Sequence, residues 1–181
     1  MRTKRYFISI KLPKKVINEI KNIQNLIKKK NIFNGKFTEP ENLHLTLKFL
    51  GEIDDYKINK AKVKLGEIRF KIFDCSLGNV GVFSKKFIRI IWIELLGKVF
   101  ELQKEVDNKL EWLFEPEKRF MSHITIARVK HVFNKKEAIS YLNEIKPIKI
   151  KFKIDKFYLM ESELSPEGAI YKDIKKYNLE S

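Results

Sequence analysis

Two short segments of this 181-residue chain repeat one pattern, in which a histidine and a threonine are separated by a single apolar residue. Residues 44–47 read His-Leu-Thr-Leu, and residues 123–126 read His-Ile-Thr-Ile. The chain has only three histidines, so chance is a weak explanation for two of them in matched tetrapeptides. The eight members of the pattern are His44, Leu45, Thr46, Leu47, His123, Ile124, Thr125 and Ile126.

The alternation around both segments is typical of β-strands, where residues two apart point to the same side. It predicts that His44 and Thr46 share one face with Lys48. The apolar residues between them, and Phe49 after them, are expected to face the core. The second copy should present its histidine and threonine in the same way, backed by its two isoleucines.

Such a pair of motifs fits chemistry at a phosphodiester. Imidazole has an ordinary pKa near 6.5, so two opposed rings can act as general base and general acid across one reacting centre. Threonine hydroxyls can donate to the non-bridging oxygens and stabilise their growing charge. These parts suffice for in-line displacement at phosphorus without a metal or other cofactor.

A metal site is the alternative reading of the histidines. His44, His123 and His131 could in principle hold zinc. Neither helical histidine spacing nor a glutamate-bearing zinc motif supports that reading, and His131 is expected to be a surface residue. The single cysteine, Cys75, excludes an intrachain disulfide and a cluster of thiolate ligands.

The composition is that of a globular protein with a strong basic surplus. There are 38 Lys and Arg against 23 Asp and Glu, which gives a net charge of +15. That charge attracts polyanions and favours a nucleic-acid partner. No apolar run approaches the roughly 18 residues of a membrane span, and residues 6–10 are too short for a signal-peptide core, so a cytoplasmic protein is expected.

The rest of the pattern predicts an α+β fold in one domain, residues 1–181, with mainly antiparallel strands. A helix rich in isoleucine should end in the lysines at 28–30, and Asp54 or Asp55 should cap a second helix. A turn is expected at 165–168. Strands are predicted at 6–12, 43–50, 68–77, 87–96, 122–130, 148–160 and 169–174, and helices at 16–30, 58–68, 99–113 and 134–144.

The segments around both motifs resemble the two-histidine (2H) phosphoesterases, and within them the 2′-5′ RNA ligase or RNA 2′,3′-cyclic phosphodiesterase family. The similarity covers residues 39–52, Glu-Pro-Glu-Asn-Leu-His-Leu-Thr-Leu-Lys-Phe-Leu-Gly-Glu, and residues 122–128, Ser-His-Ile-Thr-Ile-Ala-Arg. Residues 5–10 with Pro13 resemble the opening strand. Ser122 departs from the family, which often has proline there. The closing stretch is represented by Ser162, Leu164, Gly168 and Tyr171.

The resemblance implies a pseudo-twofold, bilobal fold with two antiparallel β-sheets facing a central cleft and helices packed outside. Each lobe would carry one motif. His44 would then be the proton donor and His123 the proton acceptor, while Thr46, Thr125 and Arg128 would bind the phosphate. Simple alternation puts Arg128 on the face opposite His123, so its entry into the cleft needs a strand end, a bulge or its long reach.

The implied activity is hydrolysis of terminal RNA 2′,3′-cyclic phosphates to 2′-phosphates, together with 2′-5′ RNA ligation. The expected partner is RNA with such ends, including tRNA fragments, and the expected state is a monomer. Phe7, Phe49 and Phe120 could stack on a base, although core packing is the more ordinary role for each. Two alternatives stay open: a phosphodiesterase for a small cyclic nucleotide such as ADP-ribose 1″,2″-cyclic phosphate, and a basic RNA-binding protein without turnover.

Overall fold

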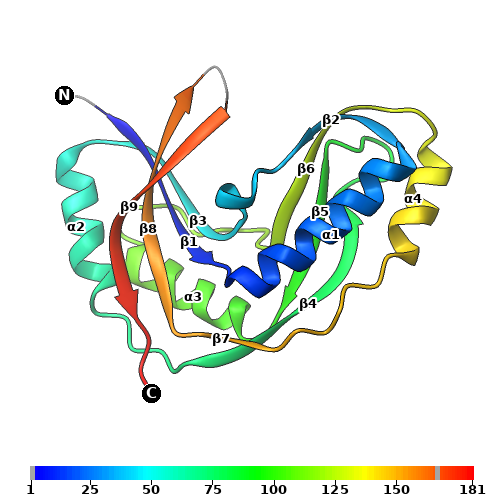
Figure 1. Ribbon diagram of the computed structural model, residues 1–181. Coiled ribbons are helices and arrows are strands. Elements are labelled where there is room, and N and C mark those ends of the chain that lie inside the picture. The colour runs from blue at the N-terminus through cyan, green and yellow to red at the C-terminus, as the bar shows by residue number, and fades with distance from the viewer. Residues whose placement is uncertain (1–2, 166–167) are drawn as a thin grey trace.

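A computed structural model describes residues 3–165 and 168–181 of the chain, with four α-helices and nine β-strands in that part (Figure 1). The helices are α1 (Lys14–Lys30), α2 (Asp55–Leu65), α3 (Val99–Leu110) and α4 (Lys135–Glu144), and a 3-10 turn, η1, spans Pro40–Asn42. The strands are β1 (Lys4–Lys11), β2 (Phe33–Phe37), β3 (His44–Ile53), β4 (Phe73–Val82), β5 (Ile90–Leu96), β6 (His123–Val132), β7 (Phe152–Ile154), β8 (Lys156–Ser165) and β9 (Gly168–Asn178).

The strands form one antiparallel sheet of nine strands, whose two halves meet at the two motif strands. They pair in the order β7-β4-β5-β6-β3-β1-β8-β9, and β2 pairs with β6. Between β3 and β6 the only paired residues in the described chain are Leu45 and Ile124, so the two halves join at a narrow seam. The predicted α+β fold is therefore confirmed, and the two antiparallel sheets that the resemblance implies are the two halves of one continuous sheet.

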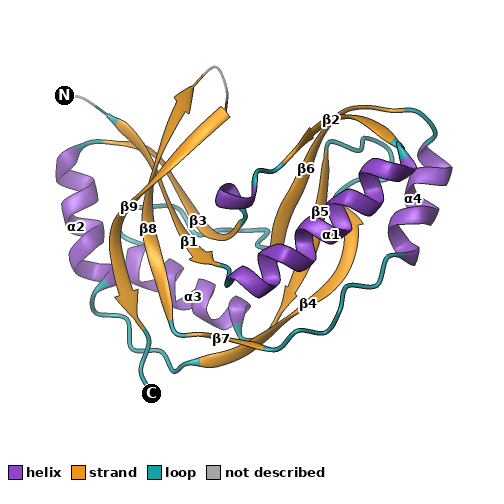
Figure 2. Ribbon diagram, viewed as in Figure 1, coloured by secondary structure: helices purple, strands orange, loops and turns teal. Residues whose placement is uncertain are grey.

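The helices pack on the outer faces of the two halves of the sheet (Figure 2). Helices α2 and α3 lie behind β3, whereas α1 and α4 cover the half that contains β4 and β6. In α1 the isoleucines at helical spacing are buried and the three lysines occupy the last turn, as predicted. Asp54, rather than Asp55, caps α2 by accepting a hydrogen bond from the Lys57 backbone N–H at 2.8 Å.

Several predicted elements differ from those observed. The strand expected at 68–77 runs from Phe73 to Val82, and the one expected at 148–160 is divided at Asp155 into β7 and β8. Residues 166 and 167 of the predicted turn lie outside the described residues. Strand β2 was not predicted, because it buries none of its residues completely and therefore has no alternation to read.

Glycine is required within β2. A Cβ atom on Gly35 would lie 2.2 Å from the backbone oxygen of Arg128 on β6. Only a residue without a side chain allows the two backbones to approach so closely. Strand β2 thereby holds β6 at the position of Arg128.

A β-bulge follows the threonine of each motif. On β3, Thr46 pairs with Ser9 and Lys48 with Ile8, so the residue between them has no partner. On β6, Thr125 pairs with Trp92 and the next paired residue is two positions further on. A bulge of one residue reverses the alternation of side chains beyond it.

The bulges overturn two predictions that rested on simple alternation. Lys48 was expected in the cleft but is buried in the core at 4% exposure, whereas Phe49, expected in the core, is 70% exposed. In the second motif the same reversal buries Ala127 and exposes Arg128. The bulge is therefore what brings Arg128 to the cleft face.

Candidate active site

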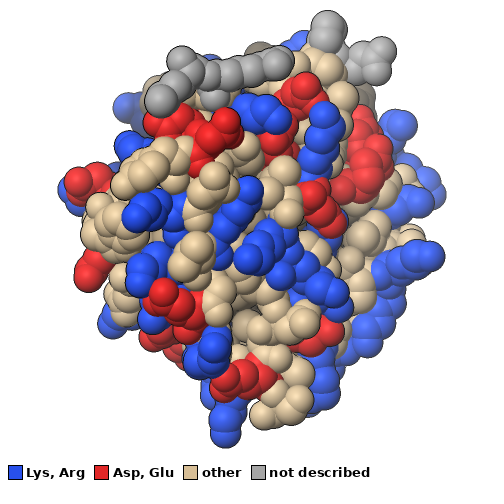
Figure 3. Space-filling view, turned by 90° about the vertical axis from the view of Figure 1, so that its left-hand side faces the viewer, with Lys and Arg blue, Asp and Glu red and all other residues tan. Residues whose placement is uncertain are grey.

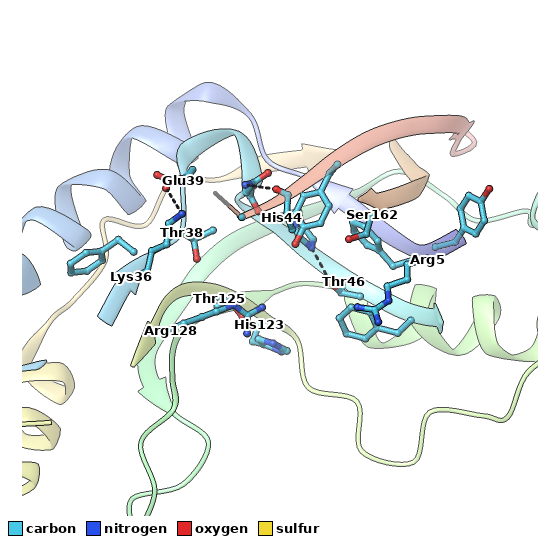
Figure 4. A pocket seen from close by; sticks show the side chains of 18 of the residues that line it. Arg5, Lys36, Thr38, Glu39, His44, Thr46, His123, Thr125, Arg128 and Ser162 are labelled. Carbon is cyan, nitrogen blue, oxygen red and sulfur yellow. Dashed lines mark hydrogen bonds and ion pairs between the residues drawn. The ribbon is translucent and has the colours of Figure 1, made fainter. Parts of the chain in front are cut away.

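A cavity of about 400 Å³ lies where the two halves of the sheet meet. Figure 4 shows the side chains of both motifs pointing into it from their separate strands. The cavity brings together His44, Thr46, His123, Thr125 and Arg128, which are far apart in the sequence. Its volume is within the range of small-molecule and nucleotide pockets. Its remaining lining includes Arg5, Phe7, Lys36, Phe37, Thr38, Glu39, Asn42, Phe49, Ser162 and Tyr171.

Both histidines are oriented by a backbone carbonyl two residues earlier. Nδ1 of His44 lies 2.7 Å from the Asn42 oxygen, and Nδ1 of His123 lies 2.8 Å from the Met121 oxygen. A carbonyl oxygen only accepts, so Nδ1 carries the hydrogen in each ring. Nε2 is thus the nitrogen that each ring offers to a reacting atom.

The pocket favours neutral histidines when it holds no anion. The pKa of His44 is lowered from 6.5 to about 4. Burial is the main cause, positive charge on His123 and Arg128 acts in the same direction, and the hydrogen bond to the Asn42 carbonyl offsets these effects only in part. Burial also lowers the pKa of His123, against the effect of the Met121 carbonyl. Both changes disfavour the charged ring.

Aromatic rings restrict each histidine. The Phe7 and Tyr171 rings lie 5.0 and 5.1 Å from the His44 ring. The Phe83 ring meets the edge of the His123 ring at 4.8 Å. Nε2 of His44 lies 3.1 Å from the Thr46 hydroxyl, which donates to the neutral ring. The imidazoles are therefore held in position before substrate arrives.

The two motifs contribute different groups from equivalent positions. Arg128 and Phe49 each come five residues after the motif histidine, and both line the cavity. The Arg128 guanidinium forms no hydrogen bond or ion pair with any described residue, and the same is true of the Thr125 hydroxyl, so both can bind an anion. One motif thus supplies a cation and the other an aromatic ring.

Other residues considered from the sequence lie elsewhere. His131 is exposed and contacts Phe133, and Phe120 packs near Phe100 with 6.1 Å between ring centres. Within residues 3–165 and 168–181, no group of three or more His, Cys, Asp or Glu side chains could hold a metal ion. Burial raises the pKa of the Cys75 thiol to about 12, which makes it a poor nucleophile. No helix in the described chain is long and apolar enough to cross a membrane.

Comparison with known proteins agrees with this geometry. The family model described as LigT like Phosphoesterase matches residues 10–92 and residues 94–171, so each histidine–threonine motif falls in one matched segment. The chain belongs to this family. Its resemblance to 2H phosphoesterases is thereby confirmed.

Full-length relatives of this phosphoesterase include the RNA 2′,3′-cyclic phosphodiesterase of Methanocaldococcus jannaschii, with 36% identity over 177 residues, 96% of this chain and 99% of the relative. The protein of the same name from Thermotoga maritima is 33% identical, covering 93% and 91% of the two chains. The crystal structure of TT0787 of Thermus thermophilus superposes with a TM-score of 0.80 at 26% identity, covering 96% of this chain and 97% of that one. Apo LigT of E. coli gives a TM-score of 0.81 at 21% identity, with complete coverage of both chains, and supports the fold.

The lining residues of the phosphoesterase pocket that were missed from the sequence include Arg5, Lys36, Thr38 and Asn42. Lys36 and Thr38 belong to or follow β2, the strand that had no readable pattern. The role of Asn42 is carried by its backbone oxygen, for which the side-chain type gives no signal. Its position two residues before the motif histidine, matched by Met121, is the one feature of the sequence that could have identified it.

Lys48 ties the first motif to the segment that leads to the second. Its ammonium forms a buried ion pair with Asp107 of α3 and donates to the Glu115 backbone oxygen at 2.7 Å. The other carboxylate oxygen of Asp107 accepts from the Gln103 side chain at 2.7 Å and the Glu117 backbone N–H at 2.9 Å. The pair therefore fixes the bulge of β3 on α3 and the start of the segment before β6.

Removal of the Lys48 ammonium should leave the Asp107 carboxylate buried without its cation. We expect Lys48→Met to lower the free energy of unfolding by roughly 3–5 kcal/mol, measured by urea denaturation. Lys48→Met/Asp107→Asn should lose markedly less, because the amide oxygen can still accept from Glu117. Equal losses in the two variants would show that the buried charge is not what matters.

An anion in the pocket should raise the pKa of His44, since it stabilises the protonated ring. Sulfate binding between pH 5 and 6 is therefore expected to take up protons, up to about one per site, because His44 changes from neutral to charged. The measurement is calorimetry in buffers of different ionisation enthalpy. His44→Asn should abolish most of the uptake, and His131→Ala should not; uptake that persists in His44→Asn would contradict the interpretation.

Proposed function

We propose that this phosphoesterase opens the terminal 2′,3′-cyclic phosphate of RNA to a 2′-phosphate. The observation that carries the proposal is the convergence of two oriented Nε2 atoms, two threonine hydroxyls and one guanidinium on a single pocket. Relatives named RNA 2′,3′-cyclic phosphodiesterase that align over nearly the whole chain support it. We further propose one catalytic domain spanning both lobes, acting as a cytoplasmic monomer on RNA ends that include tRNA fragments.

In the proposed reaction, the oxygen of a water molecule attacks phosphorus as the bond to the ribose 3′-oxygen breaks. Nε2 of His123 accepts the proton of the water. Nε2 of His44 donates a proton to the departing 3′-oxygen. The product carries a 2′-phosphate and a 3′-hydroxyl, and the two rings have exchanged protonation states, which solvent then restores.

The phosphate contacts follow from the same geometry. Thr46 and Thr125 can donate to the non-bridging oxygens, and Arg128 supplies a charge-assisted contact. The bound diester also supplies the negative charge that protonation of His44 requires. His44 is neutral in the empty pocket at pH 7, so the negative charge of the substrate is what raises its pKa and makes it a proton donor.

Ligation uses the same steps with a different nucleophile. If the 5′-hydroxyl of a second RNA takes the place of water, its oxygen attacks phosphorus and the 3′-oxygen again leaves. The product is a 2′-5′ linkage. His123 would accept the proton of that hydroxyl, and no further group is needed.

Product analysis tests the function directly. A short RNA with a 2′,3′-cyclic phosphate should be converted to the 2′-phosphate form in excess EDTA, because no proposed step uses a metal. Turnover confined to ADP-ribose 1″,2″-cyclic phosphate would favour a small-nucleotide phosphodiesterase. RNA binding without turnover of either compound would place the protein among RNA-binding proteins instead.

Variants of the motifs should separate chemistry from scaffold. His44→Ala and His123→Ala should each lower kcat by roughly 10²–10⁴-fold, and the double variant should be little worse than either. Thr46→Val and Thr125→Val keep the shape and should cost roughly 10–10³-fold. His131→Ala is the matched control and should be nearly silent. A loss in folded His131→Ala as large as in His44→Ala would contradict the assignment.

The two histidine roles can be told apart by the leaving group. A cyclic phosphorothiolate with sulfur at the 3′ position has a leaving group that needs no proton. It should restore much of the activity of His44→Ala but little of that of His123→Ala. If the phosphorothiolate restores the activity of His123→Ala and not that of His44→Ala, His123 is the proton donor and His44 the proton acceptor.

A further inference from the structure

A basic and aromatic surface lies outside the cavity, on the half of the molecule that contains β6. It is made of residues 83–89, which connect β4 to β5, and residues 130–136, at the end of β6 and the start of α4. We call it the basic–aromatic surface. Its exposed members are Phe83, Lys85, Lys86, Phe87, Arg89, Lys130, Phe133, Lys135 and Lys136.

The two segments are held side by side by hydrogen bonds. The Lys135 ammonium donates to the Lys86 backbone oxygen at 3.0 Å. The Val129 backbone N–H donates to the Arg89 oxygen at 2.8 Å. The Arg89 guanidinium makes a longer contact of 3.4 Å with the Lys130 oxygen. The surface is thus a fixed part of the fold.

The cations of this surface have no acidic partners. Neither 83–89 nor 130–136 contains Asp or Glu, and in the part of the chain that the structure describes none of the six cations forms an ion pair. The opposite side of the molecule differs. There Lys and Arg are interleaved with Asp and Glu (Figure 3). Exposed ion pairs outside the basic–aromatic surface include Lys11–Asp173 and Lys172–Glu163.

Three aromatic rings are exposed among these cations. Phe83 is 50% exposed, Phe87 is 62% exposed and Phe133 is 57% exposed. The ammonium groups of Lys86 and Lys135 lie 5.6 and 5.9 Å from the centre of the Phe87 ring. Single-stranded nucleic acid is bound by this combination, because bases stack on rings while cations contact the phosphates.

The surface begins at the catalytic pocket. The Phe83 ring is in contact with the His123 ring at 4.8 Å and lies 5.9 Å from the Trp92 ring. A strand whose terminal phosphate lies between the two histidines can therefore continue over Phe83 towards Phe87. We propose that the basic–aromatic surface binds the single-stranded RNA beyond its terminal nucleotide, an inference that rests on the proposed function.

Positive charge alone does not distinguish the basic–aromatic surface from other basic parts of the molecule as an RNA-binding site. The outer face of α1 also carries lysines without acidic partners in the described chain, at positions 14, 21, 28 and 29, but its one large exposed apolar residue is Leu26. Helix α1 thus offers positive charge without stacking rings. It provides the matched control for the lysines, and exposed Phe100 on α3 provides one for the rings.

The test is fluorescence anisotropy with a labelled single-stranded RNA that ends in a 3′-hydroxyl and cannot react. Phe87→Ala should weaken binding about tenfold, whereas Phe100→Ala should not. Lys85→Ala/Lys86→Ala should reduce the slope of log affinity against log salt by about 1.4, since each phosphate contact contributes about 0.7. Lys28→Ala/Lys29→Ala should leave the slope unchanged. Equal effects of each variant and its control would overturn the proposal.

Heparin separates stacking from charge, because it offers anions without bases. Its binding should weaken in Lys85→Ala/Lys86→Ala and not in Phe87→Ala. If Phe87→Ala weakens heparin and RNA equally, base stacking is excluded and the proposal is wrong.

Turnover then distinguishes this proposal from the proposed function. For an RNA oligonucleotide with a 2′,3′-cyclic phosphate, kcat/KM should fall in Phe87→Ala, whereas for a mononucleotide 2′,3′-cyclic phosphate it should not. If RNA binding depends on Phe87 but no cyclic phosphate is turned over, the proposed function is wrong, whereas the surface still binds RNA. If kcat/KM for the oligonucleotide is unchanged by all these substitutions, the proposed role of the basic–aromatic surface is wrong, whereas the proposed function stands.

Discussion

The alternation of side chains along a β-strand allows the histidine and the threonine of a motif, two residues apart, to face a cleft. It cannot place the residue five positions after the histidine on the same face. The bulge after Thr46 and the bulge after Thr125 remove that constraint. Each bulge reverses the alternation of side chains beyond it, so the residue five positions after the motif histidine faces the cleft again. The same reversal turns Lys48 inward, where the core must neutralise it, and α3 supplies Asp107 for this purpose. The lining of the cavity, the position of Arg128 and the contact with α3 therefore depend on two matching bulges, one in each motif strand.

The electrostatics of the pocket complement this geometry. Two imidazoles, held by carbonyl oxygens and crowded by aromatic rings, are disfavoured as cations while the pocket is empty. The neighbouring guanidinium adds to that effect. A bound phosphodiester supplies negative charge between the two rings, so the proton donor becomes protonated when the substrate binds. The pocket is thus arranged for an anion and gains little from a neutral ligand.

Much of this could be predicted from the sequence. The two motif strands, α1 and a cap at Asp54 or Asp55 were predicted because their periodicity or cap chemistry is local. The predicted positions of Lys48 and Phe49 were wrong because a bulge leaves no mark in a sequence such as Leu-Lys-Phe-Leu, which continues the apparent alternation of the strand. Strand β2 was missed because its pairing depends on Gly35 fitting against β6, which is a long-range contact. Asn42 acts through its backbone, and side-chain types say nothing of that.

The order of strands has a consequence for how the molecule can be divided. The half that contains β3 takes β1 from the start of the chain and β8 and β9 from its end, while the other half joins β2, which precedes β3, to β4, β5, β6 and β7. The two segments matched by the family model are therefore interlaced in space, although each carries one motif. Neither half can be cut out as a contiguous piece of chain. Because β1 pairs with β8 across some 150 residues, the first lobe is completed only when nearly the whole polypeptide is present, which favours late closure during folding.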